Sequence, residues 1–218
     1  MIIRHALTCL ITFILFVKAA AEIAGGQVIA ATSVVYSKDK EGNKLTGLLY
    51  LVMTEGKSVQ ILGKPYHQGK FSLHLEKSGA EEITTALDPL CIPLTAGGDL
   101  IFRQGTWPVV THDFNKDGIS EFNLGQRGNS WGDHFMLFTF AQDGSGKVEA
   151  MTVSEEMEDN YLHPEDGGPS THYLLETKEG FKHTFTERGD PVSREVYIHY
   201  RWNAKANKFE ESKRVAID

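Results

Sequence analysis

The chain has little cysteine. Only two of its 218 residues are cysteines, and Cys9 lies in an apolar run near the start of the sequence. That leaves Cys91 alone in the remainder, so no intramolecular disulfide can form there. A folded domain of this size must then take its stability from its core or from a bound ion. Because Cys91 is flanked by Leu90 and Ile92, we expect a small core hydrophobe, with a reactive nucleophile as the alternative.

Basic residues are also scarce. Lysine and arginine number 22 against 29 aspartate and glutamate residues, and the formal net charge is −7. Residues 1–21 hold two basic residues and no acid, so residues 22–218 hold 20 basic and 29 acidic residues, a formal charge of −9. No basic cluster is longer than Lys213-Arg214, which argues against a surface that follows nucleic-acid phosphates. A cationic partner suits this composition better.

A long hydrophobic run is confined to the first residues of the chain. Arg4 is followed by a nearly continuous apolar stretch, residues 6–17, and small residues follow that stretch. This is the pattern of a secretory signal peptide over residues 1–21, cut after Ala21. The stretch is about a dozen residues long, short of the roughly 20 that cross a bilayer, which disfavours the alternative of a membrane anchor. We therefore predict a periplasmic or secreted protein with no membrane span after cleavage.

Apolar residues in the rest of the chain recur at every second position. Residues 28–36 alternate along one face, and residues 48–53 are apolar on both, as in a strand covered on its two sides. Similar runs occupy residues 58–62, 71–75, 100–103, 135–140, 147–153 and 197–202. Polar, glycine-containing turns separate the runs, and no convincing 3.6-residue period is present. We predict one all-β domain over residues 22–218, with antiparallel sheets in a sandwich or a small propeller-like array.

Oxygen-bearing side chains concentrate in residues 113–121. The segment reads Asp-Phe-Asn-Lys-Asp-Gly-Ile-Ser-Glu, with side-chain oxygens at positions 1, 3, 5 and 9 and glycine at position 6. Ca²⁺ takes about six to eight oxygen ligands, and alternate residues of a tight loop can turn their side chains toward one centre. The glycine permits the sharp bend. The predicted metal ligands are the side chains of Asp113, Asn115, Asp117 and Glu121 and the carbonyl of Ile119.

The flanks distinguish this loop from an EF-hand. An EF-hand loop has a bidentate acid at position 12 and lies between two helices. Here position 12 is Leu124, and the flanking residues 106–112 and 122–124 have strand-like sequences. We therefore predict a strand-loop-strand calcium site in which Glu121 completes the ligand shell. The alternative is an acidic β-turn that holds no ion.

The segment from Val110 through the loop resembles the calcium loop of integrin-α-type FG-GAP and VCBS repeats. In those repeats an apolar strand leads into Asp-x-Asn-x-Asp-Gly and then into another strand. Here the loop is followed by Gly-Asn-Ser-Trp at 128–131, an aromatic strand, and Tyr-Arg-Trp-Asn at 200–203. That order, over roughly residues 100–218, is similar to a family of Gram-negative periplasmic proteins with a single such loop, which includes immunity proteins against lysozyme-like effectors. It also resembles periplasmic inhibitors of invertebrate-type lysozyme.

The resemblance implies a structural ion and a protein-binding role. The ion would tie two strands together, and the partner would be a cationic lysozyme-like hydrolase. Trp131, just beyond the loop, is a candidate partner contact, with packing as the equal alternative. The competing function is a periplasmic hydrolase that uses a His/Asp pair, for which His112-Asp113 and Asp133-His134 are candidates. We expect a binding protein rather than an enzyme, because the sequence has no His-Glu-x-x-His and no Cys-x-x-Cys motif.

Overall fold

The computed structural model describes seven stretches of the chain, all built from strands, turns and connecting segments. They are residues 26–78, 82–91, 97–104, 111–127, 133–153, 174–187 and 194–217. Within these stretches there is no helix, and hence none long and apolar enough to cross a membrane. The predicted all-β class is confirmed. The predicted signal peptide, residues 1–21, and Trp131 lie outside the described residues.

The first sheet, here called the N-terminal sheet, is five-stranded. Its strands lie in the order β1-β2-β3-β4, and β5 pairs with β3. The strands are β1 (Gln27–Lys38), β2 (Lys44–Ile61), β3 (Lys64–Lys77), β4 (Glu82–Ala86) and β5 (Leu100–Arg103). Two predicted runs, residues 48–53 and 58–62, belong to the single strand β2, which has one irregularity in its register with β3. β2 turns into β3 through Leu62 and Gly63, both at positive φ, as a type I′ hairpin requires.

Two further sheets follow along the chain. The central sheet has the order β6-β7-β8-β9, and the C-terminal sheet has the order β10-β14-β13-β12-β11. The central strands are β6 (Thr111–His112), β7 (Glu121–Arg127), β8 (Asp133–Phe140) and β9 (Val148–Ala150). The C-terminal strands are β10 (Thr152–Val153), β11 (Leu174–Glu176), β12 (Gly180–Glu187), β13 (Arg194–Asn203) and β14 (Lys208–Ile217). Pairing is antiparallel except for the short parallel contact between β10 and β14.

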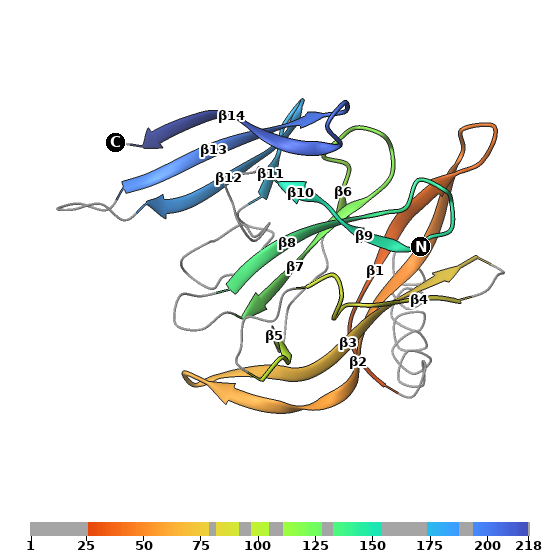
Figure 1. The fold of residues 1–218 in the computed structure, drawn as a ribbon, viewed down its shortest axis with the longest axis vertical. Coiled ribbons are helices and arrows are strands. Elements are labelled where there is room, and N and C mark those ends of the chain that lie inside the picture. Colours follow the sequence, from red (N-terminus) through yellow and green to blue (C-terminus); the bar gives the residue numbers. More distant parts are fainter. Residues whose placement is uncertain are drawn as a thin grey trace, which may run out of the picture.

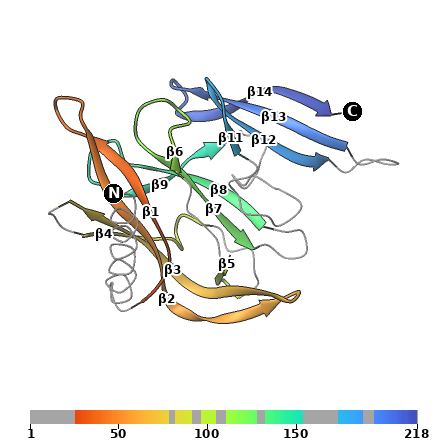
Figure 2. The same cartoon turned by 180° about the vertical axis from the view of Figure 1, so that it is seen from behind.

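The three sheets form layers, with the central sheet between the other two (Figure 1, Figure 2). Two hydrophobic cores fill the spaces between them, and strand β8 contributes to both. Phe138 belongs to the first core, with residues of β2, β3 and β5, whereas the adjacent Leu137 belongs to the second core, with residues of β12, β13 and β14. Successive side chains of a strand point to opposite faces, so a strand in the middle layer must be apolar on both.

Strand β7 is buried along its whole length because it also lies in the middle layer. Phe122 and Leu124 point into the first core. The alternate positions are polar, and Glu121 and Asn123 are only 0% and 3% exposed. Charged side chains are almost never fully buried without a partner. The layering of the sheets therefore places an acidic side chain inside the molecule, at the first residue of β7.

Cys91 lies in the first core and is 4% exposed. Burial, with a smaller contribution from Asp88, raises the pKa of its thiol to about 12. The thiol is therefore protonated at neutral pH, and a protonated thiol is a poor nucleophile. The prediction of a core residue is confirmed.

Candidate metal centre

Residues 113–120 connect two antiparallel strands whose ends meet. In the pairing of β6 with β7, His112 lies opposite Glu121. Asp113 therefore leaves β6 directly beside the residue that begins β7. Between these ends the chain reverses through Gly118, whose φ of 80° is accessible to glycine at little cost. The strand pairing thus brings the first and last acidic residues of the loop together.

Three side chains of the loop bond to its own backbone. Asp113 Oδ2 accepts the N–H of Gly118 at 3.1 Å. Asn115 Oδ1 accepts the N–H of Asp117 at 2.9 Å, and Asp117 Oδ1 accepts the N–H of Ile119 at 2.7 Å. Aspartate and asparagine favour such local bonds. The alternate side chains are therefore held against the loop's own backbone.

Glu121 is a carboxylate with 0% of its surface exposed. Its Oε2 accepts the backbone N–H groups of Phe114 and Asn115. Among the described residues, its Oε1 has no hydrogen-bond partner, and neither has the buried Oδ1 of Asp113. Burial is the main cause that raises the pKa of Glu121 to about 8; the N–H of Phe114 opposes the shift, and the charges of Asp117 and Asp113 add to it. Among the described residues, no basic side chain pairs with the ionised form of Glu121.

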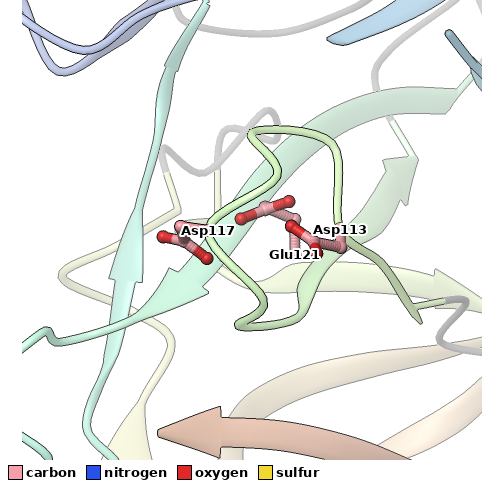
Figure 3. A group of neighbouring side chains, drawn as sticks. All are labelled: Asp113, Asp117 and Glu121. Carbon is pink, nitrogen blue, oxygen red and sulfur yellow. The ribbon is translucent and has the colours of Figure 1, made fainter. Parts of the chain in front are cut away.

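Asp113, Asp117 and Glu121 form one acidic cluster. A carboxylate oxygen from each lies within 4.8 Å of the other two. All three side chains come from the same loop (Figure 3). Carboxylates at this spacing repel one another, and a bound cation reverses that interaction. The cluster could therefore hold a metal ion.

The loop is fastened to the N-terminal sheet. The N–H of Ser120 donates to the carbonyl of Val35 in β1 at 2.8 Å, and its Oγ accepts the N–H of Val35 at 2.9 Å. The ammonium group of Lys38 donates to the carbonyl of Asp117. Ile119 packs against the first core. The end of the loop is thus held between β1 and the first core.

The same loop is fastened to the C-terminal sheet. Phe114 is 1% exposed and belongs to the second core, with its ring centroid 5.1 Å from that of Phe181 in β12. Lys116 forms an ion pair with Glu176 of β11. The contacts of this and the preceding paragraph mean that one loop of the central sheet touches the sheets on both sides of it. These anchors have no signature in the sequence, because they join residues that are far apart along the chain.

Only three of the five predicted ligands belong to the acidic cluster. The structure brings the carboxylates of Asp113, Asp117 and Glu121 together. Asn115 lies in the same loop, but its Nδ2 donates to Asp117 Oδ2 at 3.0 Å and its Oδ1 accepts a backbone N–H. Ile119 contributes its N–H to the loop and its side chain to the core. Ligand roles for Asn115 and for the carbonyl of Ile119 stay predictions.

The histidines do not complete a His/Asp pair among the described side chains. His112 Nδ1 lies 3.8 Å from Glu176 Oε2, and its ring stacks on Phe114 with the centroids 4.7 Å apart. The side chains of Asp133 and His134 lie outside the described part of the chain. A hydrolase that uses such a pair therefore stays a prediction.

One polar cluster, formed by Ser72, His74 and Glu82, was not predicted from the sequence. On β3, Ser72 Oγ lies 2.8 Å from His74 Nε2, and His74 Nδ1 contacts Glu82 Oε1 of β4. Ser72 and His74 are 4% and 2% exposed, and β3 is paired with strands on both sides there. A nucleophilic serine needs access and free N–H donors for an oxyanion. We interpret the cluster as a satisfied polar patch; its only sequence signal is the Ser-x-His spacing on one strand face.

Comparisons with known proteins find no related protein. A scan against protein-family models found no match, and searches of curated proteins and of solved structures found none either. The resemblance to a periplasmic calcium-loop family thus stays a prediction from the sequence.

Proposed function

We propose that the protein binds Ca²⁺ in loop 113–121 and that the ion joins its three sheets. The observation that carries this proposal is Oε1 of Glu121, a buried carboxylate oxygen with no hydrogen-bond partner among the described residues. Glu121 shares its surroundings with two more carboxylates, those of Asp113 and Asp117. A buried charge without a partner is strongly unfavourable. A divalent cation supplies the partner.

The donor atoms favour calcium over softer metals. The acidic cluster offers only carboxylate oxygens, and the predicted additional ligands, Asn115 and the carbonyl of Ile119, are oxygens as well. Ca²⁺ binds oxygen at about 2.3–2.6 Å, so ligands on opposite sides of the ion lie about 4.6–5.2 Å apart. The carboxylate oxygens of the cluster all lie within 4.8 Å of one another, which leaves room for such an ion among them. Mg²⁺ usually keeps several waters and takes only one or two carboxylates, whereas this cluster offers three.

The role we propose for the ion is structural. The loop contacts β1 through Ser120, the first core through Ile119 and the second core through Phe114. Fixing the loop therefore fixes the relation between the layers. Binding to the folded state alone adds about 3–4 kcal/mol to the free energy of unfolding when free Ca²⁺ exceeds its Kd by several hundredfold. This gain takes the place of the disulfide that one cysteine cannot form.

The protein-binding role is the second part of the proposal. We infer an exported protein that binds a cationic protein, with a lysozyme-like hydrolase as the predicted partner. The formal charge of −7, and of −9 without the predicted signal, supports it, because opposite charges accelerate association and this effect weakens in salt. Mixing the protein with lysozymes of several types at low and high salt tests the partner. Absence of a complex with every lysozyme at low salt would contradict it.

Thermal and urea unfolding in Ca²⁺ and in chelator test whether Ca²⁺ binds to the folded protein. We expect Ca²⁺ to raise the midpoint in the natural protein, and the double substitution Asp113→Asn/Asp117→Asn to remove this rise. The matched control is Asp39→Asn/Asp143→Asn, which makes the same change of charge in two turns outside the acidic cluster and should keep the rise. Identical unfolding of the natural protein in Ca²⁺ and in chelator would overturn the proposal. An equal effect of Mg²⁺ would contradict the choice of calcium.

A further inference from the structure

A cavity of about 320 Å³ lies beside the acidic loop. Its walls come from three parts of the fold: the loop, the β8–β10 segment and the hairpin of β13 and β14. The loop supplies Asp117, the middle segment supplies Glu149 and Thr139, and the hairpin supplies Trp202 and Asn207. Small-molecule sites have volumes of roughly 300–1,000 Å³, so the cavity has room for a small ligand or for one long side chain.

The lining of this cavity has one sign of charge. Asp117 and Glu149 are acidic, and among the residues that line the cavity there is no lysine, arginine or histidine. The remaining polar groups are amides and hydroxyls, which can accept hydrogen bonds through their oxygens. Without a bound metal ion, an anion would meet two carboxylates and no basic side chain among the residues that line the cavity. The cavity therefore selects for a cation or for a neutral polar group.

Trp202 provides an aromatic wall in a fixed position. Its ring centroid lies 4.9 Å from that of Phe209, and the two planes are tilted by 58°. Phe209 is fully buried in the second core, and Trp202 is partly buried against that core. A tryptophan face attracts a cation more strongly than any other aromatic side chain. An indole in a fixed position that lines the same cavity as Asp117 and Glu149 can contribute to a site for an organic cation.

We propose that this cavity binds the guanidinium or ammonium group of an arginine or lysine side chain presented by a protein partner. The proposal deepens the inferred binding of a cationic protein and rests on it. Glu149 would pair with the cation, Trp202 would cover its face, and the amide of Asn207 would accept one of its N–H groups. Arginine suits such a site best, because its planar group both stacks on aromatic rings and pairs with carboxylates.

The neighbouring ion would leave this selectivity intact. With Ca²⁺ bound, the three carboxylates of the loop, Lys116 and the ion sum to no net charge, so the negative charge that remains in the cavity is that of Glu149. Glu149 lies on β9 and is not a member of the acidic cluster. Its substitution should therefore change binding in the cavity without changing the effect of Ca²⁺ on stability. This separates a failure of the cavity from a failure of the metal site.

The test is a calorimetric titration of the Ca²⁺-loaded protein with acetyl-Gly-Arg-Gly-amide. The matched probe replaces arginine by citrulline, which has nearly the same shape and no charge. We expect the arginine peptide to bind at least about tenfold more tightly, since charge-assisted pairing and cation–π contact are both lost in citrulline. Glu149→Gln should remove most of this difference, and Glu55→Gln, on an exposed site of β2, should keep it.

Trp202→Ala should also abolish binding of the arginine peptide, and Trp202→Phe, which preserves the packing on Phe209 better, should weaken it by a smaller factor. Equal affinities for the arginine and citrulline peptides would overturn the proposal in favour of a neutral polar ligand. If agmatine, a free guanidinium compound, bound tightly and the peptide did not, the natural ligand would be a small molecule rather than a protein side chain, and the proposal would be overturned. No binding of either probe, with a normal rise of stability in Ca²⁺, would refute the cavity alone.

Discussion

Two turns of this protein share aspartate, asparagine, lysine, glutamate and glycine but differ in burial. The turn 39–43 reads Asp-Lys-Glu-Gly-Asn and joins β1 to β2, whereas loop 113–121 joins β6 to β7. In the first, Asp39 Oδ1 accepts the N–H groups of Glu41 and Asn43 at 2.9 and 2.8 Å, and Oδ2 accepts Asn43 Nδ2 at 2.8 Å. These bonds, led by the Asn43 side chain, lower the pKa of Asp39.

In the second turn, burial outweighs the local hydrogen bonds. Glu121 is fully buried and its pKa is raised, and two carboxylate oxygens of the loop have no hydrogen-bond partner among the described residues. The turn 39–43 is exposed, so water solvates any oxygen that the backbone does not. An acidic sequence therefore becomes a candidate metal site only where the fold removes water and supplies too few donors.

The largest difference should appear at the second residue of each turn. Phe114→Ala removes an aromatic ring from the second core and should lower the free energy of unfolding by about 3–5 kcal/mol. Lys40→Ala, at the corresponding position of the exposed turn, should change it by less than about 0.5 kcal/mol. Urea unfolding of both variants measures the contrast. A small effect of Phe114→Ala would mean that the loop does not depend on the core beneath it.

The next effect concerns the ion. Glu121→Gln keeps the size of the side chain and removes its charge, so the proposed Ca²⁺-dependent gain of about 3–4 kcal/mol should largely disappear. Asp39→Asn should keep the whole gain. Urea unfolding in Ca²⁺ and in chelator gives both values. Retention of the full gain in Glu121→Gln would show that the ion, if bound, lies elsewhere.

The pH dependence without metal should have opposite signs in the two turns. In the folded protein Glu121 has a pKa of about 8, whereas the pKa of a glutamate in an unfolded chain is about 4.3. Between about pH 4.3 and pH 8 the folded state binds more protons than the unfolded state. The contribution of Glu121 to the free energy of unfolding is therefore most favourable at low pH. It falls as the pH rises toward 8, by up to about 1.4 kcal/mol per pH unit. The lowered pKa of Asp39 acts in the other direction, with stability lost only as the pH falls into the acidic range.

Unfolding in chelator at several values between pH 5 and pH 8 checks this expectation. In the natural protein the free energy of unfolding should fall with rising pH, and Glu121→Gln should flatten the profile. A profile that rises over this interval in chelator would contradict a raised pKa for Glu121.

The smallest dependence on Ca²⁺ should be that of Asp39→Ala. This substitution removes the hydrogen bonds that close the exposed turn, and each typical bond contributes about 0.5–1.5 kcal/mol net. The loss should be the same in Ca²⁺ and in chelator, because Asp39 is not part of the acidic cluster. A loss that depends on Ca²⁺ would mean that the two turns are coupled through β1.

Local sequence patterns predicted much of the fold. Alternation at period two is a property of single strands, and it located most strands and the all-β class. It failed at β2, where residues 48–53 and 58–62 form one strand, because an irregularity in register interrupts the alternation without ending the pairing. The oxygen spacing of 113–121 likewise predicted the acidic cluster, since the spacing is local to one loop.

The burial of the cluster could not be predicted in the same way. Whether Glu121 faces water depends on a third layer, and the residues that form it lie far along the chain. The same holds for the bond between Ser120 and Val35, which are 85 positions apart, and for a cavity that combines Asp117 with Trp202. Contacts between residues that are far apart along the chain produce no periodic pattern in the sequence.

Residues that are close together in the chain therefore suffice to predict most of the strands, the excess of acidic residues and the ligand spacing of loop 113–121. The packing of the three sheets buries Glu121 and leaves its Oε1 without a hydrogen-bond partner among the described residues, and it brings the loop into contact with all three sheets. The physical reason is that the cost of a charge depends on how much water surrounding elements remove, which only the packed layers define.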